Sequence, residues 1–132
     1  MAKIISIDYG LKNSGIAFSN NKKNIIYGAK NLNNKILFLK IKKYIIKYNI
    51  KYIIIGWPIN YQNKNFKIIK YIKIFLLLLI NKFPNLSYNF IDERFTTSYF
   101  KNIYNIKKKT NINYLSAILI LKSYLLINNY EL

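Results

Sequence analysis

The stretch Ile4-Ile5-Ser6-Ile7-Asp8-Tyr9-Gly10 is a short apolar run that ends in an acidic residue and a turn glycine. Isoleucine-rich runs of this length are typical of buried strands, and glycine marks the turn that ends them. We therefore expect a strand over residues 3–9, with Asp8 near its carboxyl end. Two further short runs, at 15–19 and 24–30, follow after polar turns. The three runs together predict an antiparallel meander.

The rest of the chain alternates between helical and strand patterns. Apolar residues recur at helical spacing over residues 33–48, 65–82 and 111–128. In the last of these segments we expect one side of the helix to carry Leu115, Ile118, Leu119, Lys122 and Leu126. The runs at 52–56 and 88–91 are short and rich in apolar residues, as expected for strands buried on both faces. Crossovers between parallel strands are right-handed, which puts these two strands beside the first one.

We predict one α/β domain over residues 1–132, built on a five-stranded mixed sheet flanked by helices. The sheet combines a three-strand antiparallel meander with two parallel strands. Thr96 or Thr97 is expected to cap a short helix that runs to about Tyr104, before a basic loop at 106–110.

The acidic residues are few, and three of the four lie at the ends of strands. The chain has a formal net charge of +18, and Asp8, Asp92 and Glu93 lie at or just after the end of a predicted strand, whereas Glu131 lies elsewhere. Ligands of open α/β sheets gather beyond the carboxyl ends of the parallel strands, where Gly56 also falls. We therefore expect a site for a divalent metal at this edge. Carboxylate oxygens suit Mg²⁺ or Mn²⁺, and the lack of His and Cys excludes imidazole bases, thiol catalysis and most zinc sites.

Neighbouring side chains on a strand point to opposite faces, so only one of Asp92 and Glu93 comfortably faces Asp8. We favour Glu93 as the metal ligand, with Asp92 as a structural residue or an outer ligand, and the reverse assignment stays open. Structural roles are also open. Asp8 could shape the hairpin turn, Asp92 and Glu93 could cap the next helix or pair with Arg94, and Gly56-Trp57-Pro58 could simply end a strand.

The positive charge favours a polyanion as partner. Lys, Asn, Ile and Tyr make up most of the chain, and their codons are A/T-rich, so drift in an A/T-rich genome explains most of the lysine excess. A charge of +18 still attracts nucleic acid, with salt-sensitive affinity. The longest uninterrupted apolar run, Ile74–Ile80, is far shorter than the ~20 residues that span a bilayer. We expect a soluble cytoplasmic protein with no membrane partner.

Four segments, in order, carry a recognisable set of motifs. Ile7–Ala17 fits Asp-x-Gly-x-Lys-Arg-x-Gly-x-Ala, Ile55–Pro58 fits Val-Gly-x-Pro, Asp92–Thr97 fits Asp-Glu-Arg-x-Ser/Thr-Thr, and Ser116–Leu125 fits Ala-x-x-Ile-Leu-Gln-x-Tyr-Leu. Together they resemble the YqgF/RuvX family. Its members are RNase H-fold proteins described as Holliday-junction-resolvase-like and as nucleases of pre-16S rRNA. The resemblance runs from residue 4 to about 126.

The resemblance implies an RNase H-like fold and a Mg²⁺ or Mn²⁺ site with one carboxylate from each of three motifs. Asp8 and Glu93 match two of these positions, but the third is Asn113, which lowers the charge of the site from −3 to −2. The family's second basic residue in the first motif is Asn13 here. The residues that would contact nucleic acid are Lys12, Arg94, Thr96, Thr97, Lys107, Lys108 and Lys109, although for Lys12 a solvated surface role stays open.

The function expected from this resemblance is metal-dependent hydrolysis at the 5′ end of pre-16S rRNA. Its partner would be the rRNA precursor or a ribosomal particle, and the protein would be a monomer or a weak dimer. One alternative is an RNA-binding ribosome-maturation factor whose catalysis is weakened at Asn113. A second is a nuclease of structured DNA such as the Holliday junction. A sugar-kinase or actin-like ATPase, suggested by Asp8-x-Gly10, is disfavoured because such proteins need two lobes.

Overall fold

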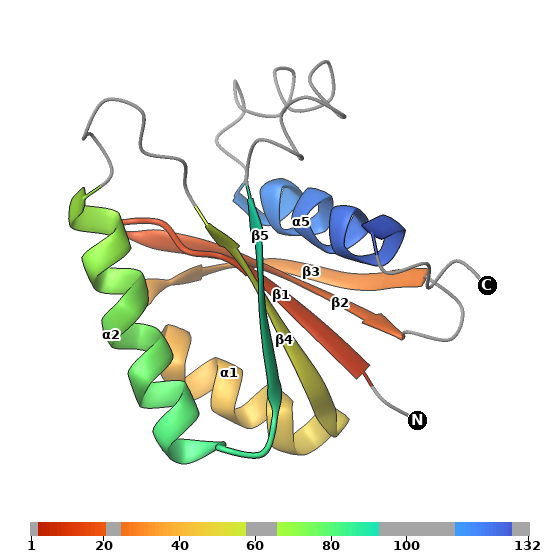
Figure 1. Ribbon diagram of the computed structural model, residues 1–132, viewed down its shortest axis with the longest axis horizontal. Helices are drawn as coiled ribbons and strands as arrows, with labels where there is room; N and C mark the ends of the chain where they lie inside the picture. The colour runs from red at the N-terminus through yellow and green to blue at the C-terminus, as the bar shows by residue number, and fades with distance from the viewer. Residues whose placement is uncertain (1–2, 21–24, 58–65, 93–112, 128–132) are drawn as a thin grey trace.

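The computed structural model describes residues 3–20, 25–57, 66–92 and 113–127 (Figure 1). The elements are β1 (Lys3–Asp8), β2 (Asn13–Asn20), β3 (Ile25–Asn33), α1 (Asn34–Tyr48), β4 (Ile50–Trp57), α2 (Phe66–Lys82), β5 (Ser87–Asp92) and α5 (Asn113–Ile127).

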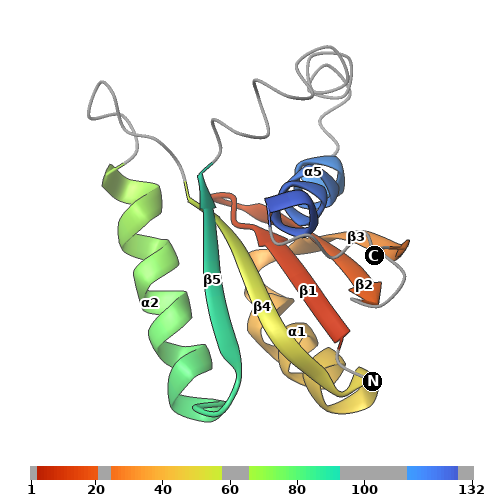
Figure 2. The ribbon, with the colours of Figure 1, turned by 45° about the vertical axis from the view of Figure 1, so that its right-hand side comes forward.

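The five strands form one sheet in the order β3-β2-β1-β4-β5. The β1/β2 and β2/β3 pairs are antiparallel, whereas β1/β4 and β4/β5 are parallel. The predicted five-stranded mixed sheet, with its meander and two parallel strands, is therefore confirmed. Helices α1 and α2 cover one face and α5 covers the other (Figures 1 and 2).

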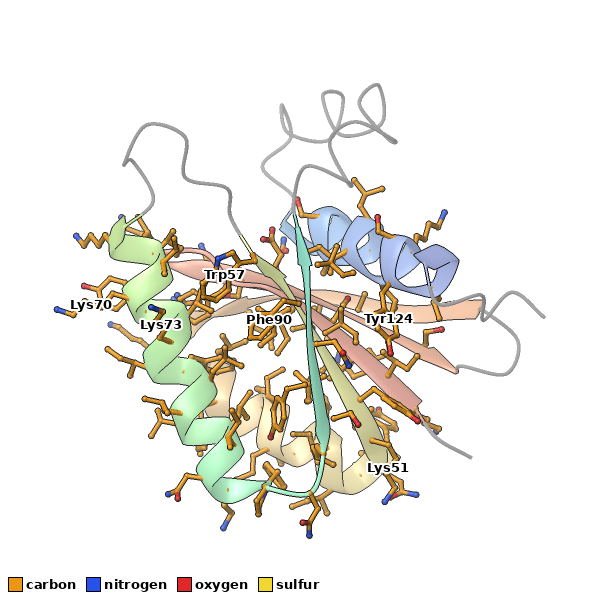
Figure 3. The ribbon with its side chains drawn as sticks, viewed as in Figure 1. Lys51, Trp57, Lys70, Lys73, Phe90 and Tyr124 are labelled. Carbon is orange, nitrogen blue, oxygen red and sulfur yellow. The ribbon has the colours of Figure 1, made fainter. Side chains whose placement is uncertain are left out.

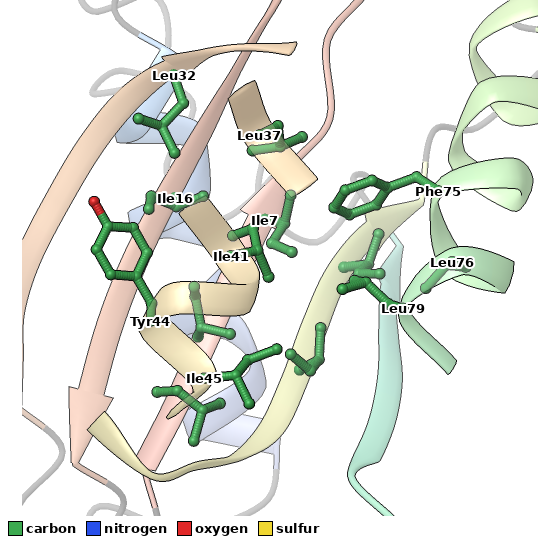
Figure 4. Close-up of a cluster of buried hydrophobic side chains, with 14 of the residues drawn as sticks. Ile7, Ile16, Leu32, Leu37, Ile41, Tyr44, Ile45, Phe75, Leu76 and Leu79 are labelled. Carbon is green, nitrogen blue, oxygen red and sulfur yellow. The ribbon is translucent and has the colours of Figure 1, made fainter. Parts of the chain in front are cut away.

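Alternation along the strands divides the core into two layers. Ile5 and Ile7 of β1 join the layer under α1 and α2, part of which is drawn in Figure 4. Ile4 joins the smaller layer under α5. In β4, Ile53 and Ile54 go to opposite layers, and both are fully buried. The expectation of burial on both faces is confirmed for β4. It is wrong for β5, where Phe90 is exposed, because β5 is the edge strand of the sheet.

The ends of two strands differ from the prediction, because the β2/β3 ladder is longer than the apolar runs suggested. β2 begins at Asn13 and β3 continues to Asn33, and these two residues pair with each other. The polar residues at this end are held by ladder hydrogen bonds, which apolar patterning does not reveal. Asn33 then becomes the N-cap of α1, where its side chain accepts a hydrogen bond from the backbone N–H of Lys35 at 2.8 Å.

The buried sides of α1 and α2 agree with the helical spacing of the sequence. Leu37, Ile41, Tyr44 and Ile45 of α1 are buried, as are Ile72, Phe75, Leu76 and Leu79 of α2. None of the described helices is both long and apolar enough to cross a membrane.

The prediction for α5 was partly wrong. Periodicity suggested that Leu115, Ile118, Leu119, Lys122 and Leu126 share one side. Leu119 is buried, but Lys122 is exposed and Ile118 is only half-buried. The helix rests instead on a face that includes Ala117, Ile120, Leu121 and Tyr124. Nearly every position of α5 is apolar, so the pattern could not single out one face. The predicted helix to Tyr104 and the basic loop lie outside the described residues.

Candidate functional site

Three strand ends meet at the edge of the sheet where the sequence predicted a site. Ile7 pairs with Ile55 at the end of β1, Gly56 pairs with Ile91, and Trp57 pairs with Asp92. Adjacent strands lie about 4.8 Å apart, so Asp8, Gly56 and Asp92 lie close together at this edge, with Asp92 one residue further along than Gly56. The expected convergence at the carboxyl edge is confirmed for these backbone positions.

Asp8 belongs to the face of the sheet that α5 covers. It continues the alternation of Ile4 and Ser6, and Ile4 packs in the layer under α5. The buried Ser6 donates a hydrogen bond of 2.6 Å from its hydroxyl to the carbonyl oxygen of Ala117 in α5. This bond fixes the height of α5 over β1 two residues before Asp8.

The N-terminal end of α5 points toward the carboxyl ends of the parallel strands (Figure 1). Asn113, the first residue of α5, comes four residues before Ala117, which the Ser6 bond holds over β1. The backbone of α5 therefore begins on the face that carries Asp8 and toward the same edge of the sheet, while the side chain of Asn113 lies outside the described part.

The loop between β1 and β2 is held by a small hydrogen-bond network. The Gly10 N–H donates to the Ser14 hydroxyl at 3.1 Å, and that hydroxyl donates to Asn34 Oδ1 at 2.6 Å. Asn34 Nδ2 completes the ring by donating to the Gly10 carbonyl at 2.6 Å. The backbone N–H of Asn34 also donates to the Lys12 carbonyl at 2.8 Å. The first turn of α1 thus fixes the loop that follows Asp8.

Gly10 is required by the tightness of this loop. A Cβ atom at this position would lie 2.2 Å from the carbonyl oxygen of Asn13, a backbone atom that cannot move away cheaply. Lys12, in the same loop, is exposed. The Asp8 loop is therefore a fixed turn that presents one lysine to solvent.

Tyr9 anchors the other side of the loop to the core. Its ring packs against Phe75 of α2, with 5.4 Å between the ring centroids. Burial raises the pKa of the Tyr9 phenol above its usual 10.0, and Tyr71 adds to the rise. A neutral phenol at this position suits the apolar surroundings.

Of the predicted metal ligands, only Asp8 has a described side chain, and its carboxylate is the kind of donor that a hard divalent cation takes. Within residues 3–20, 25–57, 66–92 and 113–127, no cluster of three or more His, Cys, Asp or Glu side chains could hold a metal. The remaining predicted residues lie outside that part of the chain, namely Glu93, Arg94, Thr96, Thr97, Lys107, Lys108 and Lys109, as does the side chain of Asp92.

Comparison with known proteins agrees with the motifs. The sequence model of the RuvX family, described as Holliday junction resolvase, matches residues 2–126. This chain belongs to the RuvX family. It is 38% identical to a Karelsulcia muelleri protein named "Putative pre-16S rRNA nuclease" over 87% of this chain and 83% of the relative. A RuvX relative from Bacteroides thetaiotaomicron with the same name is 33% identical over 95% of this chain and 96% of its own.

Solved structures place this RuvX protein among RNase H-like folds. The RuvC protein of T. thermophilus, solved in complex with a Holliday junction substrate, superposes with a TM-score of 0.71. The alignment covers 99% of this chain and 98% of RuvC, with 6% sequence identity. At that identity the likeness concerns the fold alone, and the expected RNase H-like fold is confirmed.

Sequence reasoning missed the residues that position this edge of the RuvX chain. Ser6 is a lone hydroxyl in an otherwise apolar run, which signals a buried hydrogen bond without naming its partner. Asn34 stands beside Asn33 at the start of a helical pattern, where either could be the cap. Only the fold distinguishes them.

Proposed function

We propose that this protein is a metal-dependent nuclease that processes the 5′ end of the 16S rRNA precursor during ribosome biogenesis. The names of its relatives support this substrate. The observation that carries the proposal is Asp8. Its carboxylate ends the central strand of the sheet, on the α5-covered face and at the edge toward which the N-terminal end of α5 points.

Asp8 and Glu93 are the proposed metal ligands, with Asn113 as a neutral third ligand and Asp92 as an outer residue. The preference for Glu93 rests on alternation. Ile91 packs in the layer under α5. Because side chains alternate along a strand, position 92 belongs to the opposite face, and position 93 would return to the face of Asp8. Divalent ions in such sites activate water and stabilise the leaving oxygen of a phosphodiester.

The basic residues would hold the nucleic-acid backbone, which positions a substrate without reading its sequence. Of this set, Lys12 is the residue that lies in the described part of the chain, in a loop that is fixed by Asn34 and follows Asp8 directly. Further contacts are proposed for Arg94, Thr96, Thr97, Lys107, Lys108 and Lys109.

Asn113 favours a second candidate function. An amide offers a carbonyl oxygen but no charge, so Mg²⁺ binding should be weaker than with three carboxylates. The chain could then act as an RNA-binding ribosome-maturation factor with little or no cleavage. A four-way DNA junction is the second substrate to test, in view of the description of the family.

The experiment measures Mg²⁺- and Mn²⁺-dependent cleavage of a 5′-extended 16S rRNA precursor fragment, with a four-way DNA junction in parallel. It compares wild type, Asp8→Asn and Asn113→Asp. Glu131→Gln is the matched control, because it makes the same kind of carboxylate-to-amide change at the one acidic residue outside the predicted site. RNA affinity is measured for every variant by fluorescence anisotropy in EDTA.

We expect wild type and Glu131→Gln to cleave the RNA. Asp8→Asn should cleave at least about a hundredfold more slowly, and Asn113→Asp should cleave faster than wild type. An inert wild type that binds RNA, together with cleavage by Asn113→Asp, would establish the RNA-binding role instead. Cleavage of the junction alone would refute the rRNA substrate. Cleavage that survives Asp8→Asn would refute the site.

A further inference from the structure

Trp57 and Phe90 form an aromatic pair at the same edge of the sheet as Asp8. Their ring centroids are 5.2 Å apart, and the rings meet edge to face at 81°. Trp57 ends β4 and is half-buried against the layer under α1 and α2. Phe90 lies on the edge strand β5, and half of its side chain (50%) is exposed. The Phe90 ring is thus held in place by Trp57 and is open to solvent.

The register puts this pair close to the proposed cleavage centre. Ile55 pairs with both Ile7 of β1 and Phe90 of β5, and Trp57 lies two residues beyond Ile55. Trp57 therefore lies about one residue further along the edge than Asp8, on the adjacent strand and the opposite face. A nucleic-acid strand that crosses the edge from Asp8 meets the aromatic pair next.

Two lysines of α2 add positive charge near this end of the molecule. α2 begins at the carboxyl edge of the sheet (Figures 1 and 2), and its first turns carry the exposed Lys70 and Lys73. Figure 3 shows both lysines on the part of α2 nearest this edge. The residues of α2 include no acidic side chain. An aromatic surface with basic neighbours is the combination that binds single-stranded nucleic acid.

We propose that the exposed ring of Phe90, held in place by Trp57, stacks on an unpaired base of the substrate strand, and that Lys70 and Lys73 contact its phosphates. The proposal deepens the function above by naming a single-stranded segment next to the scissile bond. It depends on RNA binding and not on cleavage. Paired bases in a duplex do not offer their faces to a protein ring, so the site selects unpaired RNA.

Two other roles for this surface lead to different expectations. If Trp57 merely closes the core, Phe90 is dispensable for RNA binding. If the exposed apolar residues here bind a protein, RNA leaves the environment of Trp57 unchanged. A second copy of this chain is a poor occupant, because each copy carries a net charge of +18.

The chain offers a direct probe, because Trp57 is its only tryptophan. Trp57 fluorescence is titrated with a 12-nucleotide oligouridylate and with a blunt 12-base-pair RNA duplex, in EDTA so that no cleavage occurs. Anisotropy of end-labelled RNA gives the total binding independently. We expect the single strand to quench Trp57 and the duplex to bind without comparable quenching. Phe90→Leu should weaken binding of the single strand by at least about fivefold, the lower range for loss of one stacked base.

Tyr48→Leu is the matched control. Tyr48 is also a half-buried aromatic residue flanked by lysines, with Lys3 and Lys47 Nζ at 5.5 and 5.3 Å from its ring centroid. It lies at the C-terminal end of α1, beside the start of β1, and should leave the affinity within about twofold of wild type. Circular dichroism confirms that each variant is folded. Lys70→Gln and Lys73→Gln should each lower the salt dependence of binding by about one counterion.

Equal quenching by duplex and single strand would overturn the proposal, as would equal losses in Phe90→Leu and Tyr48→Leu. RNA binding without any change in Trp57 fluorescence would overturn stacking but leave the nuclease function standing. Quenching by a wild type that cleaves nothing would support the stacking site while contradicting catalysis.

Discussion

Ser6 and Ala117, which lie 111 positions apart in sequence, are joined by a buried hydrogen bond of 2.6 Å from the serine hydroxyl to the alanine carbonyl. The bond joins β1, the central strand of the sheet, to α5, the helix that covers one face of the sheet. Because it lies two residues before Asp8 and one helical turn after Asn113, it limits where the start of α5 can lie relative to Asp8. The geometry of the proposed site therefore depends on a residue that has no chemical role in it.

Ser6→Ala should lower the free energy of unfolding by about 1 kcal/mol, the usual net value of one buried hydrogen bond. It should also lower rRNA cleavage, because α5 is then free to shift over Asp8. Urea unfolding and the cleavage assay measure the two effects. Ile54→Val is the control, since it removes one methyl group from the same layer at a cost of about 1 kcal/mol without touching the bond. Equal activity in both variants would contradict the positioning role.

Asn34→Ala and Asn33→Ala should separate loop positioning from helix capping. The Asn33 side chain accepts the capping bond from Lys35, and its loss should cost about 1 kcal/mol of stability with normal RNA cleavage. Asn34 ties Ser14 and Gly10 together, so its loss should cost a similar amount and also reduce cleavage several-fold. Thermal unfolding and steady-state kinetics make the comparison, and a matching loss of activity in both variants would refute the distinction.

Gly10→Ala should destabilise the protein by about 1–3 kcal/mol, because the new methyl group would overlap the Asn13 carbonyl and force the loop open. Lys12→Ala, in the same loop but exposed, should change stability by less than about 0.5 kcal/mol. Denaturant unfolding of both variants tests this, with wild-type stability in Gly10→Ala as the result that would contradict the structure.

Tyr88→Phe should remove part of the loss of stability at alkaline pH. The Tyr88 hydroxyl donates to the carbonyls of Phe83 and Leu79, at 2.8 and 3.1 Å, and burial raises its pKa above 10.0. A group with a raised folded-state pKa stabilises the protein fully below the unfolded value and loses that contribution as pH rises through the folded value.

The difference in unfolding free energy between wild type and Tyr88→Phe should therefore be about 1 kcal/mol at pH 7 and shrink above pH 10. Measuring the difference cancels the titration of the lysines, which the two proteins share. A difference that stays constant up to pH 11 would show that the hydroxyl does not titrate as its burial implies.

Local patterning in the sequence determined the elements and the edge of the sheet at which the site lies. Isoleucine-rich runs predict β1 and β4, because burial on both faces leaves no polar alternation. The direction of each strand then brings Asp8 and Asp92 to one edge without any tertiary information. The same reasoning failed for α5, where apolar residues on all sides leave no face to choose.

Tertiary structure alone decided which face Asp8 occupies, how high α5 lies above it, and that Asn34 rather than Asn33 fixes its loop. These features depend on single hydrogen bonds, Ser6 to Ala117 and Asn34 to Gly10, whose partners are 111 and 24 residues apart. A sequence pattern indicates which residues are buried and which are exposed, because each side chain has its own preference for apolar or aqueous surroundings. The partner of a buried polar atom is set by the packing of distant segments, so it appears only when the chain has folded.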